Sequence, residues 1–368
     1  PPRAVPRGSR AFHRSGIPAR NLRLIAMDIQ NHYYGHSAAL ARYTGEKSVR
    51  HIDGLVQHGW TVASPTLVHF SDFAKLPRTA RRLVWSHHSR AWDAQRDQFS
   101  TTAIGAPWLY LSALAREVSL EPLGKTVAFP VHSTRLVKID SANSGFAKEL
   151  ARREGPAVVC VHPEDLADPA AVQVWKDHGH EVVSAGDRRD PNFLGRILYL
   201  VRAANRVVSN QLSTAVVYAA AEGTPTEIYG PAVAVGSLGT TVSTRTQQVW
   251  PEFFESSSVE ARTDIALAEL GIDDMREPDE LRELLGWDKR HVRPWFDYWC
   301  GAPLRKAGAV LGIVKRPDGA QDAGSGNSPL AFLKHPFSHL PGPLPRIATH
   351  DLLPTPLTDD HQKSGGDA

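Results

Sequence analysis

The chain contains the run VVCVHP at 158–163 and the run NRVVSNQLSTAVVYAAAEG at 205–223. Short apolar runs that end abruptly at polar residues are typical of buried parallel strands that open into a loop. In the second run, Ser213 and Thr214 precede an apolar stretch that ends at Gly223, which is the cap chemistry of a helix. Polar groups after two strands, one of them at a helix N-terminus, form the usual anion site of an open α/β sheet. The stretch therefore predicts an α/β fold that binds a phosphorylated ligand.

Seven further short apolar runs extend this pattern to both sides of the stretch. Helical segments alternate with them at the spacing of a parallel sheet with crossover helices. We therefore predict two Rossmann-like parallel-sheet domains that face a cleft. The expected strands are 22–27, 54–57, 82–85, 101–104, 126–129, 158–161, 181–184, 205–209 and 226–229.

The two ends of the chain differ in composition from the middle. The first 23 residues contain six arginines, four prolines and no acid, which favours a flexible basic arm over the amphipathic helix of a transit peptide. Gly, Ser, Pro and Asp dominate the last 50 or so residues, as in a disordered tail. The predicted division is an arm at 1–21, an N-terminal acceptor domain at 22–121, a donor-nucleotide domain at 122–248, helices that pack back on the domains at 249–314 and the tail at 315–368.

The overall composition excludes several classes of protein. The chain has 368 residues, 42% of them hydrophobic, and a net charge of +3, which gives no reason to expect a nucleic-acid partner. No apolar run approaches the ~20 residues of a membrane span. The cysteines Cys160 and Cys300 have no metal or disulfide spacing and are expected in the core. These features predict a cytoplasmic protein, with the basic arm as a peripheral contact at the inner face of a membrane.

Histidines recur directly after the predicted strands, where α/β enzymes keep their sites. Any one of them alone is more often a hydrogen-bonded structural residue, but five at this position favour a function. A neutral histidine can take a proton from a hydroxyl group, and a charged one can stabilise a departing phosphate. The five are His36, His58, His87, His132 and His162.

The sequence lacks the usual motifs for a dinucleotide, a P-loop nucleotide or a hydrolase nucleophile, and it lacks a D-x-D pair. His32 and His36 have the i, i+4 spacing of metal ligands, but the intervening Tyr33-Tyr34-Gly35 favours a loop. Phosphate binding would then depend on His, Ser, Thr and helix dipoles. We therefore expect no metal and no cofactor.

These landmarks, in their order, resemble bacterial glycosyltransferases of the two-domain GT-B architecture. The branch that they resemble contains CDP-glycerol glycerophosphotransferases and the CMP-sugar transferases for sialic acid or Kdo. The chain departs from that pattern because Val161, not a basic residue, precedes His162, and because Ser213-Thr214 replaces a pair of serines. The resemblance is carried by Gln57-His58-Gly59, Ile104-Gly105-Ala106-Pro107, Val161-His162-Pro163 and Ser209-Asn210-Gln211-Leu212-Ser213-Thr214.

The resemblance implies a metal-independent, inverting transferase with a nucleotide-activated donor, CMP- or CDP-linked. The acceptor would be a glycan or lipid-linked glycan of a bacterial surface polysaccharide such as a capsule. His58 would be the catalytic base, and His162 would act on the departing phosphate. Strand-end position and resemblance together give His132, Ser133, Thr134, His162, Pro163, Glu164, Asn210, Ser213 and Thr214 on the donor side and Asp28, His36, Gln57 and His87 on the acceptor side.

Other functions fit the same pattern. A sugar-nucleotide epimerase of the same two-domain shape would need carboxylates beside its histidines, and the strand-end acids in the sequence are Asp28, Glu164 and Asp165. A non-catalytic nucleotide- or glycan-binding protein would need only the anion site. In the simplest alternative, Ser213 and Thr214 merely start a helix in a generic nucleotide-binding domain.

Overall fold

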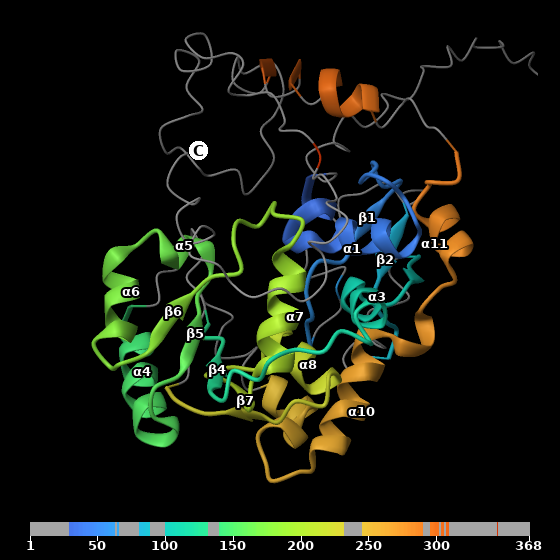
Figure 1. Cartoon of the computed structure of the whole chain (residues 1–368). Coiled ribbons are helices and arrows are strands. Elements are labelled where there is room, and N and C mark those ends of the chain that lie inside the picture. Colours follow the sequence, from blue (N-terminus) through green and yellow to red (C-terminus); the bar gives the residue numbers. More distant parts are fainter. Residues whose placement is uncertain are drawn as a thin grey trace, which may run out of the picture.

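Two parallel β-sheets organise the computed structural model (Figure 1). The structure describes residues 29–62, 65, 81–88, 100–131, 140–231, 245–289, 295–301, 303, 304, 307, 308 and 344. Several predicted features lie outside the described residues. They are the arm at 1–21, the strand at 22–27 and nearly all of the tail. The site candidates Asp28, His132, Ser133 and Thr134 and the side chain of Glu164 also lie outside them.

The first sheet has the strand order β1-β2-β3, and both pairs are parallel. Its strands are β1 (Leu55–Val56), β2 (Arg82–Val84) and β3 (Thr102–Ala103). In the central strand, Leu83 pairs with Val56 on one side and Thr102 on the other. All three residues of β2 are buried, as expected of a strand covered on both faces.

The second sheet is also entirely parallel and has the order β6-β5-β4-β7-β8. The order reverses between β4 and β7, and at such a switch point open α/β sheets bind ligands beyond the carboxyl ends of the strands. The predicted class, α/β with two parallel sheets, is confirmed. The five strands are β4 (Thr126–Ala128), β5 (Val158–Cys160), β6 (Glu181–Val183), β7 (Arg206–Ser209) and β8 (Thr226–Ile228).

Helices alternate with these strands, and α6 begins with a side-chain cap. Asp168 accepts a hydrogen bond from the backbone N–H of Ala170 at the start of α6, and Gly223 ends the segment after α8 with a φ of 73°. The helices alongside the sheets are η1 (Ile29–Gly35), α1 (His36–Tyr43), α3 (Pro107–Leu114), α4 (Asp140–Glu154), α5 (Pro163–Leu166), α6 (Pro169–Lys176), α7 (Phe193–Ala203) and α8 (Thr214–Ala221).

Among the helices near the C-terminal end, the one over Val259–Leu270 contacts helices that cover both sheets. The Thr263 hydroxyl donates to the carbonyl of Ala220 in α8 over 2.8 Å, and Leu270 accepts from the backbone N–H of Ala106, which precedes α3. No helix in the described part of the chain is long and apolar enough to cross a membrane. These elements are η3 (Pro251–Phe253), α10 (Val259–Leu270), η4 (Ile272–Asp274), α11 (Pro278–Leu284) and η5 (Asp297–Gly301).

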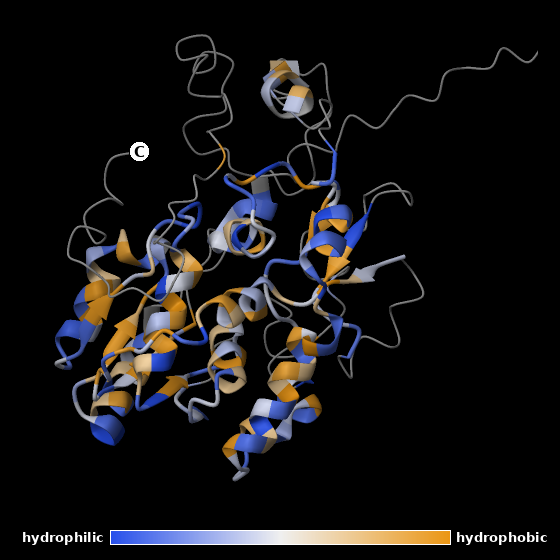
Figure 2. Ribbon diagram, turned by 45° about the vertical axis from the view of Figure 1, so that its right-hand side comes forward, coloured by the Kyte–Doolittle hydropathy of each residue, from blue (hydrophilic) through white to orange (hydrophobic). Residues whose placement is uncertain are grey.

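The two sheets share one hydrophobic core. Tyr218 of α8 stacks on Trp108 of α3, with 4.1 Å between ring centroids, and also contacts Trp85 at the end of β2 at 6.0 Å. All three rings are buried, and burial raises the pKa of the Tyr218 phenol above its usual value. Figure 2 shows hydrophobic residues along the strands and on the helix faces that cover them. The same cluster includes Leu83 of the first sheet and Val127 of the second.

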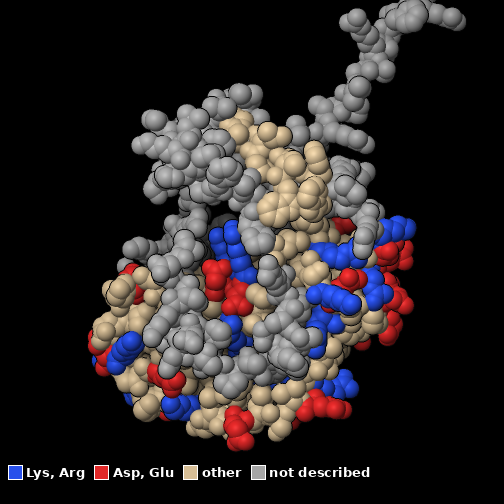
Figure 3. All heavy atoms as spheres, turned by 45° about the horizontal axis from the view of Figure 1, so that its top comes forward, with Lys and Arg blue, Asp and Glu red and all other residues tan. Residues whose placement is uncertain are grey.

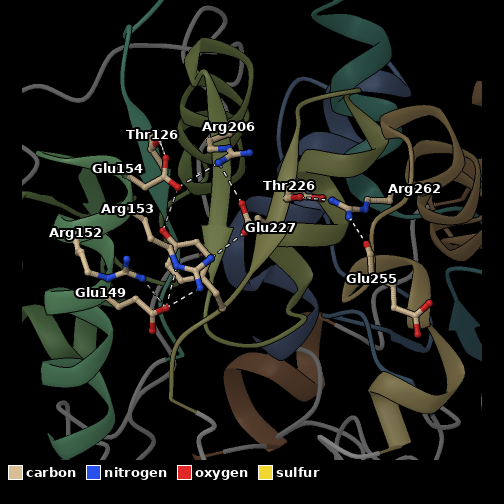
Figure 4. Close-up of polar contacts among 11 residues, drawn as sticks. Thr126, Glu149, Arg152, Arg153, Glu154, Arg206, Thr226, Glu227, Glu255 and Arg262 are labelled. Atoms are coloured by element: carbon tan, nitrogen blue, oxygen red, sulfur yellow. Dashed lines mark hydrogen bonds and ion pairs between the residues drawn. The ribbon is translucent and has the colours of Figure 1, made fainter.

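Charged side chains form a network at the amino ends of β4 and β7 (Figure 4). Glu154 accepts from the Thr126 hydroxyl over 2.8 Å and lies 3.3 Å from the Arg206 guanidinium. Arg206 and Arg153 each lie 3.1 Å from the carboxylate of Glu227. The network lies at the opposite end of the strands from the predicted site, so it serves the structure of the sheet.

Candidate functional site

The carboxyl ends of β4 and β7 are joined by two side chains of the predicted phosphate motif. The Ser209 hydroxyl donates to the carbonyl of Phe129 over 2.6 Å. The Asn210 Oδ1 accepts from the backbone N–H of Val131 over 2.9 Å. Both bonds cross between the strands at which the sheet order reverses. The motif is thus fixed at the switch point of the second sheet.

Three polar atoms in the turn between β7 and α8 have no hydrogen-bond partner among the described residues. They are the Nδ2 of Asn210, the Oε1 of Gln211 and the Oγ of Ser213, and all three atoms are buried. Ser213 is the N-cap residue of α8, yet its hydroxyl makes no cap hydrogen bond. Buried polar atoms are nearly always hydrogen-bonded. The two that can donate, the Asn210 Nδ2 and the Ser213 hydroxyl, lie at a positive helix end and fit an anionic ligand.

Thr214, also predicted on the donor side, contacts the other sheet. Its Oγ1 accepts a hydrogen bond from the backbone N–H of Trp60 over 3.0 Å. Trp60 lies in the loop after β1, two residues beyond His58. The predicted acceptor-side loop therefore lies against the first turn of α8.

Gln57 holds this loop in shape. Its Nε2 donates to the carbonyl of Gly59 over 2.8 Å, and its Oε1 accepts from the backbone N–H of Trp85 over 2.9 Å. The indole of Trp85 in turn donates to the Gln57 carbonyl. Gln57 was expected to face the acceptor, but its side chain is 4% exposed and its amide is bonded within the protein. It is a framework residue that fixes the backbone around His58.

Tyr34 brings the two predicted catalytic histidines together. Its ring centroid lies 6.2 Å from that of His58, with nearly parallel planes, and 6.3 Å from that of His162. Its ring also contacts Phe193 of α7 at 5.1 Å. These distances are within the range of aromatic pairs. One residue from η1 therefore links the loop after β1 to the loop after β5.

The backbone of Tyr34 is in an unusual conformation. Its φ of 57° makes it the one non-glycine residue with positive φ in the described chain. Its N–H donates to the carbonyl of Arg188 over 2.6 Å. The next residue, Gly35, has a φ of 73°, and a Cβ there would lie 2.6 Å from the carbonyl oxygen of Pro191. Strained backbone of this kind is concentrated at functional sites.

The other predicted histidines lie in different surroundings from one another. His36, the first residue of α1, is 3% exposed and contacts the rings of Tyr34 and Trp85. His87 is exposed and its Nε2 lies 2.9 Å from the Thr101 hydroxyl. His32 lies 2.8 Å from the Ser37 hydroxyl, and no described group of three or more His, Cys, Asp or Glu residues could hold a metal ion.

His162 and Pro163 begin the short helix α5. The carbonyl of His162 accepts from the backbone N–H of both Asp165 and Leu166 over 3.0 Å. This bonding fixes the backbone of His162 just beyond β5, where its ring meets Tyr34. Pro163 at the first helical position suits its fixed φ and missing N–H. The His-Pro pair therefore positions the imidazole through the backbone.

Glu269 is a buried carboxylate that the sequence did not indicate. It lies on α10, is 5% exposed, and accepts from the Trp60 indole N–H over 2.9 Å. The Nδ1 of His88 lies 3.6 Å from its other oxygen. Glu269 follows β1 and β2 by about 180 residues or more in the sequence. No local sequence pattern could therefore indicate that it lies beside their loops. The first sheet therefore has an acid beside its site loops.

Of the two cysteines expected in the core, Cys160 is buried and Cys300 is not. Cys160 is buried at the end of β5, and burial raises the pKa of its thiol to about 12. The thiol is therefore protonated at neutral pH and is no nucleophile. Cys300 was expected in the core but is only half-buried.

No protein-family model and no curated protein sequence matches the chain. Among solved structures, 21 chains match it. It is similar to a protein described as a UDP-N-acetylglucosamine 2-epimerase from Listeria monocytogenes, with 13% identity and a TM-score of 0.35 over 77% of this chain and 72% of that one. It is also similar to a UDP-glucose:anthocyanidin 3-O-glucosyltransferase in complex with UDP, with 11% identity and a TM-score of 0.30 over 71% of this chain and 64% of that one, less than two thirds of its length. TM-scores of this size carry no argument about function, so the proposal below rests on the site residues.

Proposed function

We propose that the chain is an enzyme that transfers a group from a nucleotide-activated donor to a hydroxyl acceptor. One observation carries the proposal: Asn210, Gln211 and Ser213 present unbonded polar atoms at the start of α8, beside the loop that contains His58. A phosphate placed there would receive hydrogen bonds from the Asn210 amide N–H and the Ser213 hydroxyl and would lie at the positive end of the helix dipole, whereas the Gln211 Oε1 would accept from a ligand hydroxyl or amine. The switch point between β4 and β7 is where such a nucleotide would lie.

The acid–base chemistry is assigned to the histidines around Tyr34. His58 takes the proton from the acceptor hydroxyl as its oxygen bonds to the anomeric carbon, or to the phosphorus of a polyol diphosphate donor. The bond from that atom to the nucleotide phosphate breaks at the same time. His162 and the start of α8 stabilise the negative charge on the departing phosphate. A single displacement of this kind inverts the configuration at an anomeric carbon.

The identity of the donor and acceptor follows from the motif resemblance. His162-Pro163 and Ser213-Thr214 resemble the donor motifs of CMP- and CDP-dependent transferases, so we propose a cytidine nucleotide and metal-independent transfer. The acceptor is then a glycan or lipid-linked glycan of a bacterial surface polysaccharide. We also propose the five divisions of the chain predicted from the sequence, which run from the arm at 1–21 to the tail at 315–368.

Glu269 favours a second candidate function. A sugar-nucleotide epimerase needs a carboxylate as well as a histidine in its site, and Glu269 is buried beside Trp60 and His88. In that reaction no acceptor would be required. Release of free nucleotide from a sugar nucleotide only in the presence of acceptor would support the transferase, and turnover without acceptor would support the epimerase.

A thermal-shift panel of CMP, CDP, UMP, UDP, GDP and NAD tests the proposal directly. A ligand that binds only the folded state raises the unfolding temperature, and the stabilisation grows with the logarithm of the ligand concentration over Kd. We expect stabilisation by CMP or CDP, and a smaller shift at the same ligand concentration in Ser213→Ala. Stabilisation by UDP alone would indicate a uridine donor in place of a cytidine donor. The absence of a shift with every ligand would overturn the proposal that the chain binds a nucleotide.

The non-catalytic alternative is tested by replacing the proposed base. His58→Ala should abolish transfer while the thermal shift by the bound nucleotide remains. If that variant retains full activity, the chain binds its ligand without the proposed acid–base chemistry. His178→Ala is the matched control, because the His178 Nδ1 lies 2.9 Å from the Val174 carbonyl, outside the predicted site loops.

A further inference from the structure

The loop between β6 and α7 is fixed by a buried arginine of α7. The Arg196 side chain is 2% exposed, and its Nη1 donates to the carbonyl of Ala185 and to the carboxylate of Asp190, each over 2.7 Å. The other oxygen of Asp190 accepts from the backbone N–H of Asn192 over 2.8 Å. Charge-assisted hydrogen bonds of this kind are among the strong ones in proteins. The loop over 184–192 is therefore held near both of its ends.

The charges around this loop have mixed signs. Figure 1 shows the connection from β6 to α7 at the top of the molecule, between the second sheet and α1. Figure 3 turns that side forward, and the described Lys, Arg, Asp and Glu residues are interspersed on it. The loop itself contains both signs in Asp187, Arg188, Arg189 and Asp190. Charges of mixed sign give a weak net field, so the position of the loop depends on its individual bonds.

The segment η1 is bonded to both sheets. On the side of the first sheet, the Asn31 amide donates to the carbonyl of Gly54 over 3.0 Å and accepts from the backbone N–H of Val56 over 2.8 Å. On the side of the second sheet, the carbonyl of Arg188 accepts from the backbone N–H of Tyr34 over 2.6 Å. The position of Tyr34 is therefore set by β1 and by the loop after β6 together.

The backbone conformation of Tyr34 suits glycine better than tyrosine. Its φ of 57° and ψ of 23° lie in the left-handed region. A residue with a Cβ adopts this region at a steric cost that glycine avoids. Strain of this kind persists where the surrounding structure imposes it, and it is concentrated at functional sites. A tyrosine in this position indicates a role for its side chain.

The Tyr34 ring lies beside both histidines of the proposed reaction. The plane of the His58 imidazole is at 19° to the Tyr34 ring, and that of His162 is at 59°. All three side chains are half-buried. Acid–base catalysis requires an imidazole nitrogen within hydrogen-bond reach of the reacting group, and an error of about 1 Å can cost about 100-fold in rate. A ring that fixes the planes of both imidazoles would therefore affect the rate.

We propose that Tyr34 is a positioning residue for the transfer reaction, and that its ring orients the imidazoles of His58 and His162. The inference rests on the proposed function, because that function assigns the chemistry to these two histidines. Tyr34 itself neither takes the proton nor binds the phosphate. Because Arg188 holds it from the second sheet, the base on the first sheet is oriented by the sheet that binds the donor.

Three substitutions of Tyr34 separate the ring from the backbone. Tyr34→Phe keeps the ring and should retain the kcat of the parent. Tyr34→Ala and Tyr34→Gly remove the ring, so both should lower kcat about 10- to 100-fold and leave the KM for the donor unchanged. Tyr34→Gly should also unfold at a higher temperature than Tyr34→Ala, because glycine adopts a positive φ without steric cost. A loss of kcat shared with the more stable glycine variant cannot then come from poor folding.

Two measurements read out the role of the ring. Turnover is followed as release of CMP from CMP-sialic acid or CDP-glycerol, with glycerol as the acceptor. NMR relaxation of labelled imidazole carbons should show fixed rings of His58 and His162 in the parent and in Tyr34→Phe, and mobile rings in Tyr34→Gly. Tyr199→Ala is the matched control, because Tyr199 is a partly buried tyrosine six residues beyond Phe193 on α7, and it should behave as the parent does.

The outcomes separate this inference from the proposed function. Parent-like kcat in Tyr34→Gly, or imidazoles that stay fixed in it, would overturn the role of Tyr34 alone. An equal loss of kcat in Tyr34→Phe would assign the role to the hydroxyl group and would also overturn it. A parent that releases CMP from neither donor would overturn the proposed cytidine transfer, and relaxation would still decide whether Tyr34 orients the two histidines.

Discussion

The backbone N–H of Trp60 donates to the Thr214 hydroxyl over 3.0 Å, and this bond joins the loop after β1 to the first turn of α8. The same residue donates its indole N–H to Glu269 on α10. Trp60 therefore fixes three elements at the site: the loop of the proposed base, the helix of the proposed phosphate site and the helix that contacts both sheets.

Trp60→Phe should lower the free energy of unfolding by about 1–3 kcal/mol. Phenylalanine keeps most of the packing but leaves the buried carboxylate of Glu269 without its indole donor. Chemical denaturation of the parent and the variant measures the difference. Trp295→Phe is the control, because Trp295 is exposed, and it should change stability by less than about 0.5 kcal/mol. Equal stability of Trp60→Phe and the parent would contradict the bond to Glu269.

Ser213→Ala and Ser258→Ala should affect different properties, nucleotide affinity and stability respectively, although both residues are helix N-caps. The Ser258 hydroxyl accepts from the backbone N–H of Ala261, so its loss should cost about 1 kcal/mol of stability and leave nucleotide affinity unchanged. The Ser213 hydroxyl makes no cap bond, so its loss should weaken nucleotide binding about tenfold with little change in stability. Isothermal titration and thermal denaturation measure both. A stability loss confined to Ser213→Ala would show that this hydroxyl is a cap.

Asp190→Ala should destabilise the chain by roughly 3 kcal/mol. The guanidinium of Arg196 is 2% exposed and lies 2.7 Å from the Asp190 carboxylate, so the variant leaves a buried charge unpaired except for the Ala185 carbonyl. Lys125→Ala is the control, since it breaks an exposed ion pair with Glu181 and should cost less than about 1 kcal/mol. Similar losses for the two variants, measured by urea denaturation, would contradict the distinction.

Stability should decrease as the pH falls below about 6.5, in part because of His180. Burial lowers the pKa of His180, and the nearby His178 acts in the same direction. Its Nδ1 accepts from the backbone N–H of Ala157, which requires the neutral ring. The unfolded chain therefore binds a proton at a higher pH than the folded chain, and acid favours unfolding. His180→Gln should flatten the dependence of unfolding free energy on pH between 5 and 6.5, whereas an unchanged slope would contradict this role.

Each of the eight described strands coincides with a strand predicted from the sequence. Buried parallel strands consist of consecutive apolar residues because both faces are covered, so they are visible as short runs such as Val158–Cys160. The turn after β7 was visible because Ser213, Thr214 and Gly223 have the chemistry of helix ends. Local sequence was thus enough to predict the strands and to locate the strand ends at which the candidate site lies.

The contacts within the site could not be predicted in the same way. Tyr34 meets His58 and His162 because its backbone has a positive φ, which no periodicity in the sequence indicates. Glu269 reaches the loop after β1 from a distant helix. An amide beside a strand end can either bind a ligand or close its own loop, and only the fold shows that the Gln57 amide bonds within the protein.

The stacked rings of Trp108 and Tyr218 have a consequence for how the chain folds. Each ring comes from the helix layer of a different sheet, and both rings are buried in one hydrophobic cluster. Either half produced alone would expose its ring and the apolar surface around it to water. The two halves should therefore unfold in a single cooperative transition. Separately expressed halves should become stable only when they associate and pack Trp108 against Tyr218 again.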